Sequence, residues 1–276
     1  MKRRNFLKGS LAASTLTGLS TASLSALAGE PAGGRGREYY ELRAYRLKNE
    51  ANRTLLDGYL QGAALPAWNR LGIKHVGVFV QHERTGAPAA TELVDPLAVL
   101  VLIPYPSLEM FATATTRLNA DAEYQKAGAT YLRATKSEPA FNRIDSWLML
   151  AFAGMPRLEL PSYSREKRPR LFELRTYESH SELKALKKVE MFNAGEIQLM
   201  RDVGLAPVFY GQALIGANLP HLTYLLSAEN DAAHKKHWDA FKEHATWKSM
   251  SADPQYADTV SHIANRFLAP APYSQI

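Results

Sequence analysis

The feature that most constrains the fold of this chain is an internal repeat. The segment 40–45, YELRAY, recurs as FELRTY at 172–177, which is 132 residues further along. LGI at 71–73 recurs as VGL at 203–205 with the same spacing, so the two matches need no gap between them. A repeat of this length corresponds to a whole folding unit rather than to a short motif. The sequence therefore predicts two copies of one fold.

Each copy is predicted to have the order β-α-β-β-α-β, since alternating apolar runs mark four strands. In the second copy we expect strands at 171–177, 207–212, 221–227 and 261–268. In the first copy we expect strands at 39–45, 74–81, 97–103 and 147–152. This order is typical of a ferredoxin-like unit, in which two helices cover one face of a four-stranded antiparallel sheet. The fold class is therefore α+β.

The uncovered face of each sheet must be buried, and the second copy offers a matching face. We therefore expect the two units to meet face to face as an α/β barrel, a pseudo-dimer made from one polypeptide. The expected domains are residues 39–153, a Pro-containing linker at 154–169, and residues 170–276. Closure of the barrel within one chain and closure between the chains of a homo-oligomer are both compatible with the sequence.

In the second copy, the first helix is expected to begin at a capping box, Ser179-His180-Ser181-Glu182, with Ser179 as the cap. Gly204 is expected to end it. Asn230 or Asp231 is expected to cap a second helix that runs to about Lys248. The apolar stripe predicted to be buried on the first helix comprises Leu183, Leu186, Val189, Phe192, Ile197, Met200 and Val203.

Polar residues alternate along the first strand of each copy. Glu173, Arg175 and Tyr177 are two residues apart and share one face of the sheet. The first copy repeats this set as Glu41, Arg43 and Tyr45. With the intervening apolar residues placed beneath the helices, both polar sets are expected to point into the barrel. There they would form either a structural lattice of ion pairs or a polar site for a small ligand.

The first 28 residues have the pattern of a twin-arginine signal peptide. Arg3 and Arg4 precede Phe6-Leu7-Lys8, a weakly apolar run follows, and Ala26-Leu27-Ala28 forms a cleavage site. We therefore expect export to the periplasm or secretion from a bacterium, with a flexible leader at 29–38. A membrane anchor is the alternative if cleavage fails, but many Ser and Thr residues make this run weakly apolar. No stable membrane span is expected after cleavage.

Composition excludes several classes of protein. The chain has no cysteine, which rules out disulfides, iron–sulfur clusters and thiol catalysis. Its net charge is +6, but residues 1–28 hold four basic and no acidic side chains, so the remainder is 29 basic against 27 acidic, or +2. Because these charges are mixed in sign, no nucleic-acid partner is expected.

Candidate functional residues lie on the helices of the second copy. Glu196 aligns with Ala64, so this carboxylate has no polar counterpart in the first copy. The second helix carries His234, His237 and His244, but no carboxylate lies at a spacing that would complete a metal site. We therefore expect no metal.

The chain contains neither a nucleophile elbow nor a phosphate-binding loop, which leaves general acid–base chemistry open. The catalytic candidates are Glu196, His237 and Tyr210. The ligand-binding candidates are Arg175, Tyr177, Asn193 and Trp238.

Several segments of the second copy resemble the NIPSNAP family: FELRTY at 172–177, FNAGE at 192–196, VFYGQ at 208–212, LPHLTY at 219–224, WDAF at 238–241 and LAPAPYS at 268–274. The first copy matches only at Glu41-Leu42-Arg43, Tyr45 and Leu71-Gly72, so it is a divergent copy. The resemblance implies the dimeric α/β-barrel fold but supplies no catalytic residues. Related barrels include monooxygenases and haem enzymes, and a shared fold does not transfer an activity.

Two functions follow as hypotheses. The first is a protein or enzyme that binds a small molecule in a cleft between the sheet and the helices of the second copy. The alternative is a non-catalytic protein-interaction module with an exposed apolar patch. No cofactor is expected under either hypothesis. A haem enzyme with His237 or His244 as axial ligand is a third hypothesis.

Overall fold

The computed structural model describes residues 36–82 and 97–276. The predicted signal peptide at 1–28 and most of the predicted leader lie outside these residues. At the end of that leader, the Arg37 side chain donates to the Ala151 carbonyl (2.6 Å), and the Glu38 carboxylate accepts from the Leu158 amide (2.7 Å).

Within residues 36–82 and 97–151, the first half has ten elements in chain order. They are β1 (Tyr39–Arg46), α1 (Glu50–Tyr59), the π-helical turn η2 (Leu60–Ala64), α2 (Leu65–Arg70), β2 (Gly77–Gln81), β3 (Val99–Tyr105), α3 (Leu108–Asn119), α4 (Ala122–Ala127), α5 (Ala129–Leu132) and β4 (Arg143–Ala151). A short helix, α6 (Ser162–Arg165), lies in the segment that joins the halves.

The second half repeats this plan. Its elements are β5 (Leu171–Glu178), α7 (Glu182–Met191), the π-helical turn η3 (Phe192–Glu196), α8 (Ile197–Asp202), β6 (Pro207–Ile215), β7 (His221–Ala228), α9 (Asp231–Glu243), α10 (Ala245–Ala252), the 3₁₀ turn η4 (Pro254–Tyr256) and β8 (His262–Pro270). The two π-helical turns occupy the same position in the repeat, 132 residues apart.

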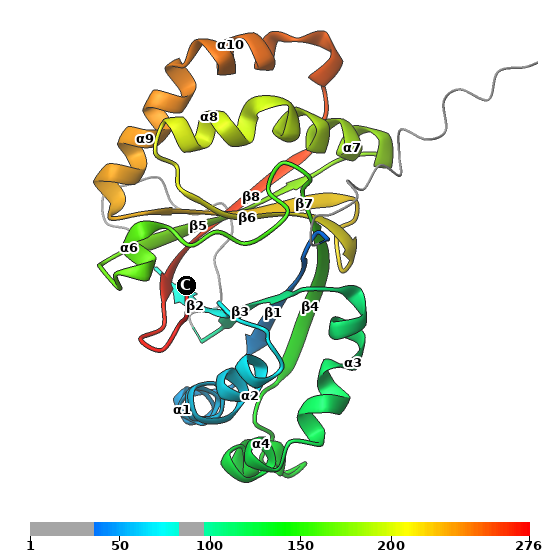
Figure 1. The fold of residues 1–276 in the computed structure, drawn as a ribbon, viewed down its shortest axis with the longest axis vertical. Coiled ribbons are helices and arrows are strands. Elements are labelled where there is room, and N and C mark those ends of the chain that lie inside the picture. The colour runs from blue at the N-terminus through cyan, green and yellow to red at the C-terminus, as the bar shows by residue number, and fades with distance from the viewer. Residues whose placement is uncertain (1–35, 83–96) are drawn as a thin grey trace, which may run out of the picture. The chain divides into compact units, whose positions relative to one another are not determined.

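The eight strands form one closed antiparallel barrel, in the order β1-β3-β2-β8-β5-β7-β6-β4. Each half contributes four adjacent strands in ferredoxin-like order, and the halves are joined at two seams, β2 with β8 and β4 with β6. Figure 1 shows α7–α10 packed on one side of the barrel and α1–α4 on the opposite side. The predicted α+β fold of two ferredoxin-like units is therefore confirmed, and the barrel closes within one chain.

The predicted direction of the polar sets is wrong. The barrel interior is apolar and is filled by the residues between them, among them Leu42, Ala44, Phe172 and Leu174, together with the buried C-terminal Ile276. Because the closed interior excludes water and offers few polar partners, the apolar face of each strand turns inward. Both polar sets turn outward beneath the helices, where helix side chains supply partners.

Helix α7 begins two residues later than predicted. Ser181, not Ser179, is the cap, and its hydroxyl accepts from the Lys184 amide (3.3 Å). Leu183 and Leu186, which were predicted to be buried, are 69% and 51% exposed, whereas Lys188 is buried. The prediction assumed one continuous α-helix, but η3 inserts a wider turn, which changes the face that the preceding residues present.

The second predicted helix is divided. Asn230 caps α9 by accepting from the Ala233 amide (2.9 Å), as predicted. At His244 the backbone becomes extended (φ −66°, ψ 135°), and His244 Nδ1 then accepts from the Thr246 amide (3.2 Å) at the start of α10.

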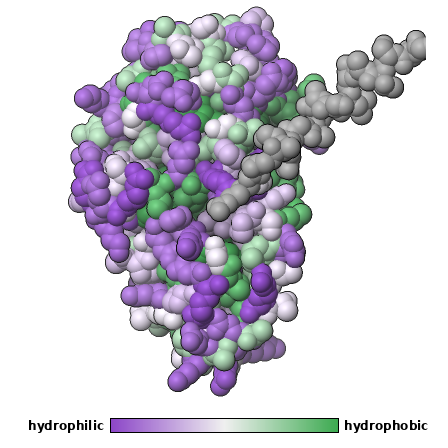
Figure 2. Space-filling model, in the orientation of Figure 1, coloured by the Kyte–Doolittle hydropathy of each residue, from purple (hydrophilic) through white to green (hydrophobic). Residues whose placement is uncertain are grey.

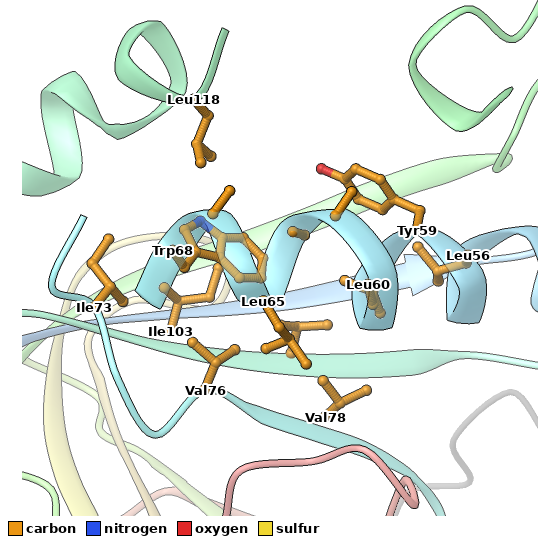
Figure 3. Close-up of a cluster of buried hydrophobic side chains, with 14 of the residues drawn as sticks. Leu56, Tyr59, Leu60, Leu65, Trp68, Ile73, Val76, Val78, Ile103 and Leu118 are labelled. Atoms are coloured by element: carbon orange, nitrogen blue, oxygen red, sulfur yellow. The ribbon is translucent and has the colours of Figure 1, made fainter. Parts of the chain in front are cut away.

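A layer of buried side chains separates each set of helices from the barrel wall. Figure 3 shows this layer in the first half, where Leu56, Leu60 and Trp68 of the helical segment face Val78 and Ile103 of the sheet. Figure 2 shows hydrophilic side chains over most of one face of the molecule, with hydrophobic side chains visible in smaller areas.

A substitution at Gly195, inside η3, measures how much the backbone geometry of that turn contributes to stability. The Gly195 backbone (φ 157°, ψ −20°) lies in a region that favours glycine. We expect Gly195→Ala to lower the free energy of unfolding by about 1–3 kcal/mol because of strain, as measured by urea denaturation. Gly58→Ala is the control: Gly58 is exposed within α1 and a Cβ there meets no atom. Gly58→Ala should raise the free energy of unfolding by about 0.5–1 kcal/mol. Equal effects of the two changes would contradict the argument.

Candidate functional site

Glu173 on β5 is the centre of a buried polar cluster beneath the helices of the second half. The residue is 1% exposed, and its carboxylate makes four hydrogen bonds. Oε2 accepts from Trp238 Nε1 and contacts His234 Nε2, each at 2.8 Å. Oε1 accepts from Arg175 at 2.6 Å and from Asn265 Nδ2 at 3.1 Å. Strand β5 and the neighbouring strand β8 thus supply one side of the cluster, and α9 supplies the other.

The surroundings of Glu173 keep it ionised. Burial alone would raise the pKa of this carboxyl, but the hydrogen bond with His234 and the charge of Arg175 outweigh burial. The net effect lowers the pKa of Glu173 to about 2. Glu173 is therefore a fixed negative charge at neutral pH, suited to orienting its neighbours rather than to exchanging protons.

Arg175 connects Glu173 to a pair of tyrosines. Its Nε donates to the Tyr177 hydroxyl (3.2 Å), and that hydroxyl shares a hydrogen bond with the Tyr224 hydroxyl (2.8 Å). The guanidinium also lies over the Trp238 ring, 4.8 Å from the centroid. These contacts hold the cationic plane of Arg175 in one orientation.

A second ion pair lies in the same layer. Lys188 Nζ on α7 donates to Glu196 Oε2 at the end of η3 (2.8 Å), and both side chains are almost fully buried. The ammonium is surrounded by aromatic rings: it lies 4.7 Å from the Phe192 centroid, 5.6 Å from that of Trp247 and 5.7 Å from that of Tyr177. The aromatic surround and the wide turn together place this pair beside the Arg175–Tyr177 contact.

Glu196 differs electrostatically from Glu173. Burial raises the pKa of the Glu196 carboxyl, and the opposing charge and hydrogen bond of Lys188 do not fully compensate for it. A buried carboxyl with a raised pKa beside an ammonium group is suited to proton transfer. The cluster thus combines a fixed anion with a group that can exchange a proton.

The first half provides an internal comparison. The residues equivalent to Lys188 and Glu196 are Leu56 and Ala64, both fully buried, and Leu56 is visible in Figure 3. The residue equivalent to Tyr210 is Val78. The same fold is therefore built in the first half without this ion pair, so the pair is not required by the architecture.

The pair of Glu and Arg, in contrast, is common to both halves. Arg43 Nε donates to Glu41 (2.6 Å), and Tyr105 and Ser146 each donate to Glu41 at 2.9 Å. Ser146 faces Arg43 in the strand register, as Asn265 faces Arg175. This shared part of the cluster has a structural role in both copies, and what distinguishes the second half is the added Lys188, Glu196, Tyr210 and Tyr224.

The structure brings five of the predicted site residues into one layer. Arg175, Tyr177, Trp238 and Glu196 belong to the polar cluster described above. Tyr210 lies beside it, with its ring stacked on Tyr224 (centroids 5.3 Å apart) and its hydroxyl donating to the sulfur of Met200 (3.0 Å). Burial raises the pKa of the Tyr210 hydroxyl well above its usual value, so this group stays protonated.

Two predicted site residues lie apart from this cluster. His237 packs against Gly204 at the end of α8, and within the described residues it makes no hydrogen bond to Glu196 or Tyr210. Asn193 is exposed, and its Oδ1 accepts from the Gly154 amide (2.7 Å). Asn193 thus ties the segment between the halves to η3 and does not face the cluster.

The two histidines of the haem hypothesis lie apart from the cluster. His244 caps α10, and His237 packs against Gly204 in the turn that follows α8. Across 36–82 and 97–276, no three His, Asp or Glu side chains are grouped so that they could hold a metal ion. Within the same ranges no helix combines the length and hydropathy needed to cross a membrane.

Sequence reasoning missed Lys188, His234, Tyr224 and Asn265 as members of the site. Lys188 was hidden because a continuous helix would place it on the exposed side. A usable signal was the buried carboxylate itself: Glu196 requires a cation, and Lys188 lies two turns earlier on the same helical segment.

Acid should destabilise the protein through Glu173. Because its pKa is lower in the folded than in the unfolded chain, its contribution to stability is present above about pH 4.5 and is lost as the pH falls towards 2. We expect the unfolding free energy of the wild type to fall by roughly 3 kcal/mol more than that of Glu173→Gln over this interval, measured by denaturant titration at each pH. Glu190→Gln, at an exposed pair with Lys187, is the control and should keep the wild-type slope. Parallel slopes for wild type and Glu173→Gln would contradict this.

Comparison of solved structures supports the fold. A putative monooxygenase from Lactobacillus acidophilus NCFM is 7% identical, with coverage of 85% of this chain and 94% of its own and a TM-score of 0.52. A putative monooxygenase from Fusobacterium nucleatum subsp. nucleatum is 9% identical, with coverage of 85% and 93% and a TM-score of 0.50. At this identity the likeness concerns the fold alone.

Sequence comparison identifies the family of the second half. Residues 172–275 match the NIPSNAP family model. An uncharacterized NIPSNAP-like domain protein from Burkholderia xenovorans is 19% identical, with coverage of 38% of this chain and 88% of its own and a TM-score of 0.35. No curated protein matches the chain. The resemblance inferred from the sequence is confirmed: residues 172–275 are a NIPSNAP-family domain, and they form the second half of the barrel.

Proposed function

We propose that the second half of this protein binds or chemically converts a small molecule at the cluster of Glu173, Arg175, Tyr177, Lys188 and Glu196. The observation that carries the proposal is the internal comparison. Burying an ion pair costs desolvation free energy, and a well-packed apolar pair is often as stable or more stable. The first half uses Leu56 and Ala64 at these positions. The charges in the second half therefore serve a purpose other than folding.

The chemistry of the cluster suggests how a ligand would be held. Arg175 offers a fixed cation for an anionic or carbonyl oxygen, and the Tyr177 and Tyr224 hydroxyls can donate beside it. Glu196, with its raised pKa, is the group that would give or take a proton, and Lys188 stabilises its ionised form. Arg175 and Trp238 keep partial exposure, so a ligand would approach over these two side chains.

We also propose that the protein acts outside the cytoplasm of a bacterium. This rests on the twin-arginine pattern of residues 2–8 and the Ala-Leu-Ala site at 26–28. Export of the folded protein would deliver the cluster already assembled.

A specific observation favours the alternative, a protein-interaction module. Leu183 and Leu186 are exposed on α7, where a partner or a second copy could cover them. Light scattering of the Leu183→Ser, Leu186→Ser variant separates the two functions. The alternative predicts that a larger assembly dissociates in this variant, whereas ligand binding at the cluster needs no change in mass.

Copying the first half into the second tests the proposed function. In the variant Lys188→Leu, Glu196→Ala we expect the unfolding free energy to equal or exceed that of the wild type, because the desolvation cost is removed. Glu196→Ala alone should lower it by about 3–5 kcal/mol, because Lys188 is left buried and unpaired. Native mass spectrometry of protein isolated from the exporting bacterium should show a bound small molecule on the wild type and none on the double variant.

The control for this test is Lys187→Leu, Glu190→Ala, an exposed ion pair on the same helix, α7. It should keep both the stability and the bound molecule. A double variant that retains the bound molecule, or a wild type that carries none from its native compartment, would count against a site at this cluster.

A further inference from the structure

A separate recess opens at one end of the barrel interior, on the opposite side of the sheet from the cluster. About 470 Å³ of space lies within this recess when the part that is open to solvent is included. Its walls include inward-facing strand residues of both halves, among them Leu42, Met149, Leu174, Thr176, His221 and Thr223, and the exposed Ala217 lies at its edge.

His221 gives this recess an available polar group. The residue is 4% exposed at the start of β7, and among the described residues its Nε2 has no hydrogen-bond partner. A buried polar atom without a partner is unfavourable, so its presence in a recess points to a ligand or water that is bound there. The other ring nitrogen, Nδ1, lies 3.3 Å from the Thr223 hydroxyl, which in turn lies 3.0 Å from the Thr176 hydroxyl. The two threonines thus fix the orientation of the imidazole.

The rest of the recess sets the character of its ligand. The deeper lining is apolar, with Leu42, Met149 and Leu174 continuous with the core of the barrel. The charged side chains in the lining are Glu178, which accepts from Asn218 (3.1 Å), and Arg266, and they are opposite in sign. Burial lowers the pKa of His221, against smaller opposing effects of the Leu222 and Ala217 backbone and of Glu178. The imidazole is therefore neutral at pH 7 and favours an uncharged partner.

We propose that this recess is a second ligand site, which takes a small uncharged molecule with an apolar body and one hydroxyl or carbonyl oxygen. The oxygen hydrogen-bonds to His221 Nε2, and the apolar body packs on Leu42, Met149 and Leu174. A hydroxyl can donate to this nitrogen or accept from it, depending on which ring nitrogen carries the proton. The site is independent of the cluster, because alternate residues of β5 and β7 face opposite sides of the sheet.

Phenol and toluene form a matched pair of probes, since they differ by a hydroxyl in place of a methyl group. In a ¹H–¹⁵N correlation spectrum of the full chain, we expect phenol to shift the signals of four residues that line the recess, Trp147, Thr176, Thr223 and Ala264. Toluene should shift the same signals at a concentration roughly tenfold higher, because it leaves His221 Nε2 without a partner.

Variants assign the polar contact. His221→Leu should weaken phenol binding roughly tenfold and leave toluene binding within about twofold. Thr223→Val preserves the shape of a buried side chain and removes the hydroxyl that contacts both His221 and Thr176, so it should weaken phenol binding less than His221→Leu does. Ala217→Trp, at an exposed position of the recess, should block both probes. Lys188→Leu, Glu196→Ala should leave phenol binding unchanged, which separates this site from the proposed function.

Phenol shifts confined to other residues would overturn the proposal. So would equal affinity for phenol and toluene, or an equal loss of both probes in His221→Leu. If His221→Leu does not fold, unchanged phenol affinity in Thr223→Val would overturn it.

Discussion

The two seams of the barrel, β2 with β8 and β4 with β6, are the contacts on which the rest of the structure depends. Each half alone would expose one face of its sheet and two strand edges, and closure removes both. Once the barrel is closed, its interior is lined by alternate residues of all eight strands, and these must be mostly apolar. The remaining residues of each strand face the helices. Closure therefore determines that polar side chains gather either beneath the helices or at an open end of the barrel.

Duplication explains how polar groups can accumulate in one half without loss of the fold. The first half keeps an apolar layer beneath its helices, with Leu56, Ala64 and Val78 at the positions that are Lys188, Glu196 and Tyr210 in the second half. The shared Glu and Arg on β1 and β5 have buried partners in both halves, so they belong to the common architecture. The π-helical turns at equivalent positions also belong to it, and only the second turn ends in a charged residue. The fold thus accepts polar and charged side chains at these positions but does not require them.

The repeat was sufficient to predict the strands, their order and the barrel, because period-2 alternation and a spacing of 132 residues are local and regular. It could not predict which face of each strand points inward. Alternation shows that a strand has a polar and an apolar face, but it does not show which of them lines the barrel and which lies beneath the helices. Leu183 and Leu186 show a second limit: the wide turn at η3 changes the phase of the helix, and no residue type in α7 signals it. For the site, Arg175, Tyr177, Trp238 and Glu196 were predictable from their types and spacing. His234 and Asn265 were not, because each comes from a segment whose approach to Glu173 depends on the closed tertiary structure. Lys188 was missed for a local reason, since the wide turn at η3 changes the face on which it lies.

Strand β5 contributes residues to two polar sites, one on each face of the sheet. Arg175 and Tyr177 face the helices, while Thr176 and Glu178, their immediate neighbours, face the recess in the barrel. The two faces differ in their surroundings: the helix side holds ion pairs that are mostly buried, and the barrel side holds His221, Glu178 and Arg266 at an opening above apolar residues. A slip of β5 by one residue would exchange these environments and bury Arg175 among interior residues of other strands, such as Leu42 and Met149, which offer it no partner. The pairing of β5 with both β7 and β8 along its length prevents this slip, so the register that closes the barrel also keeps the two polar environments separate.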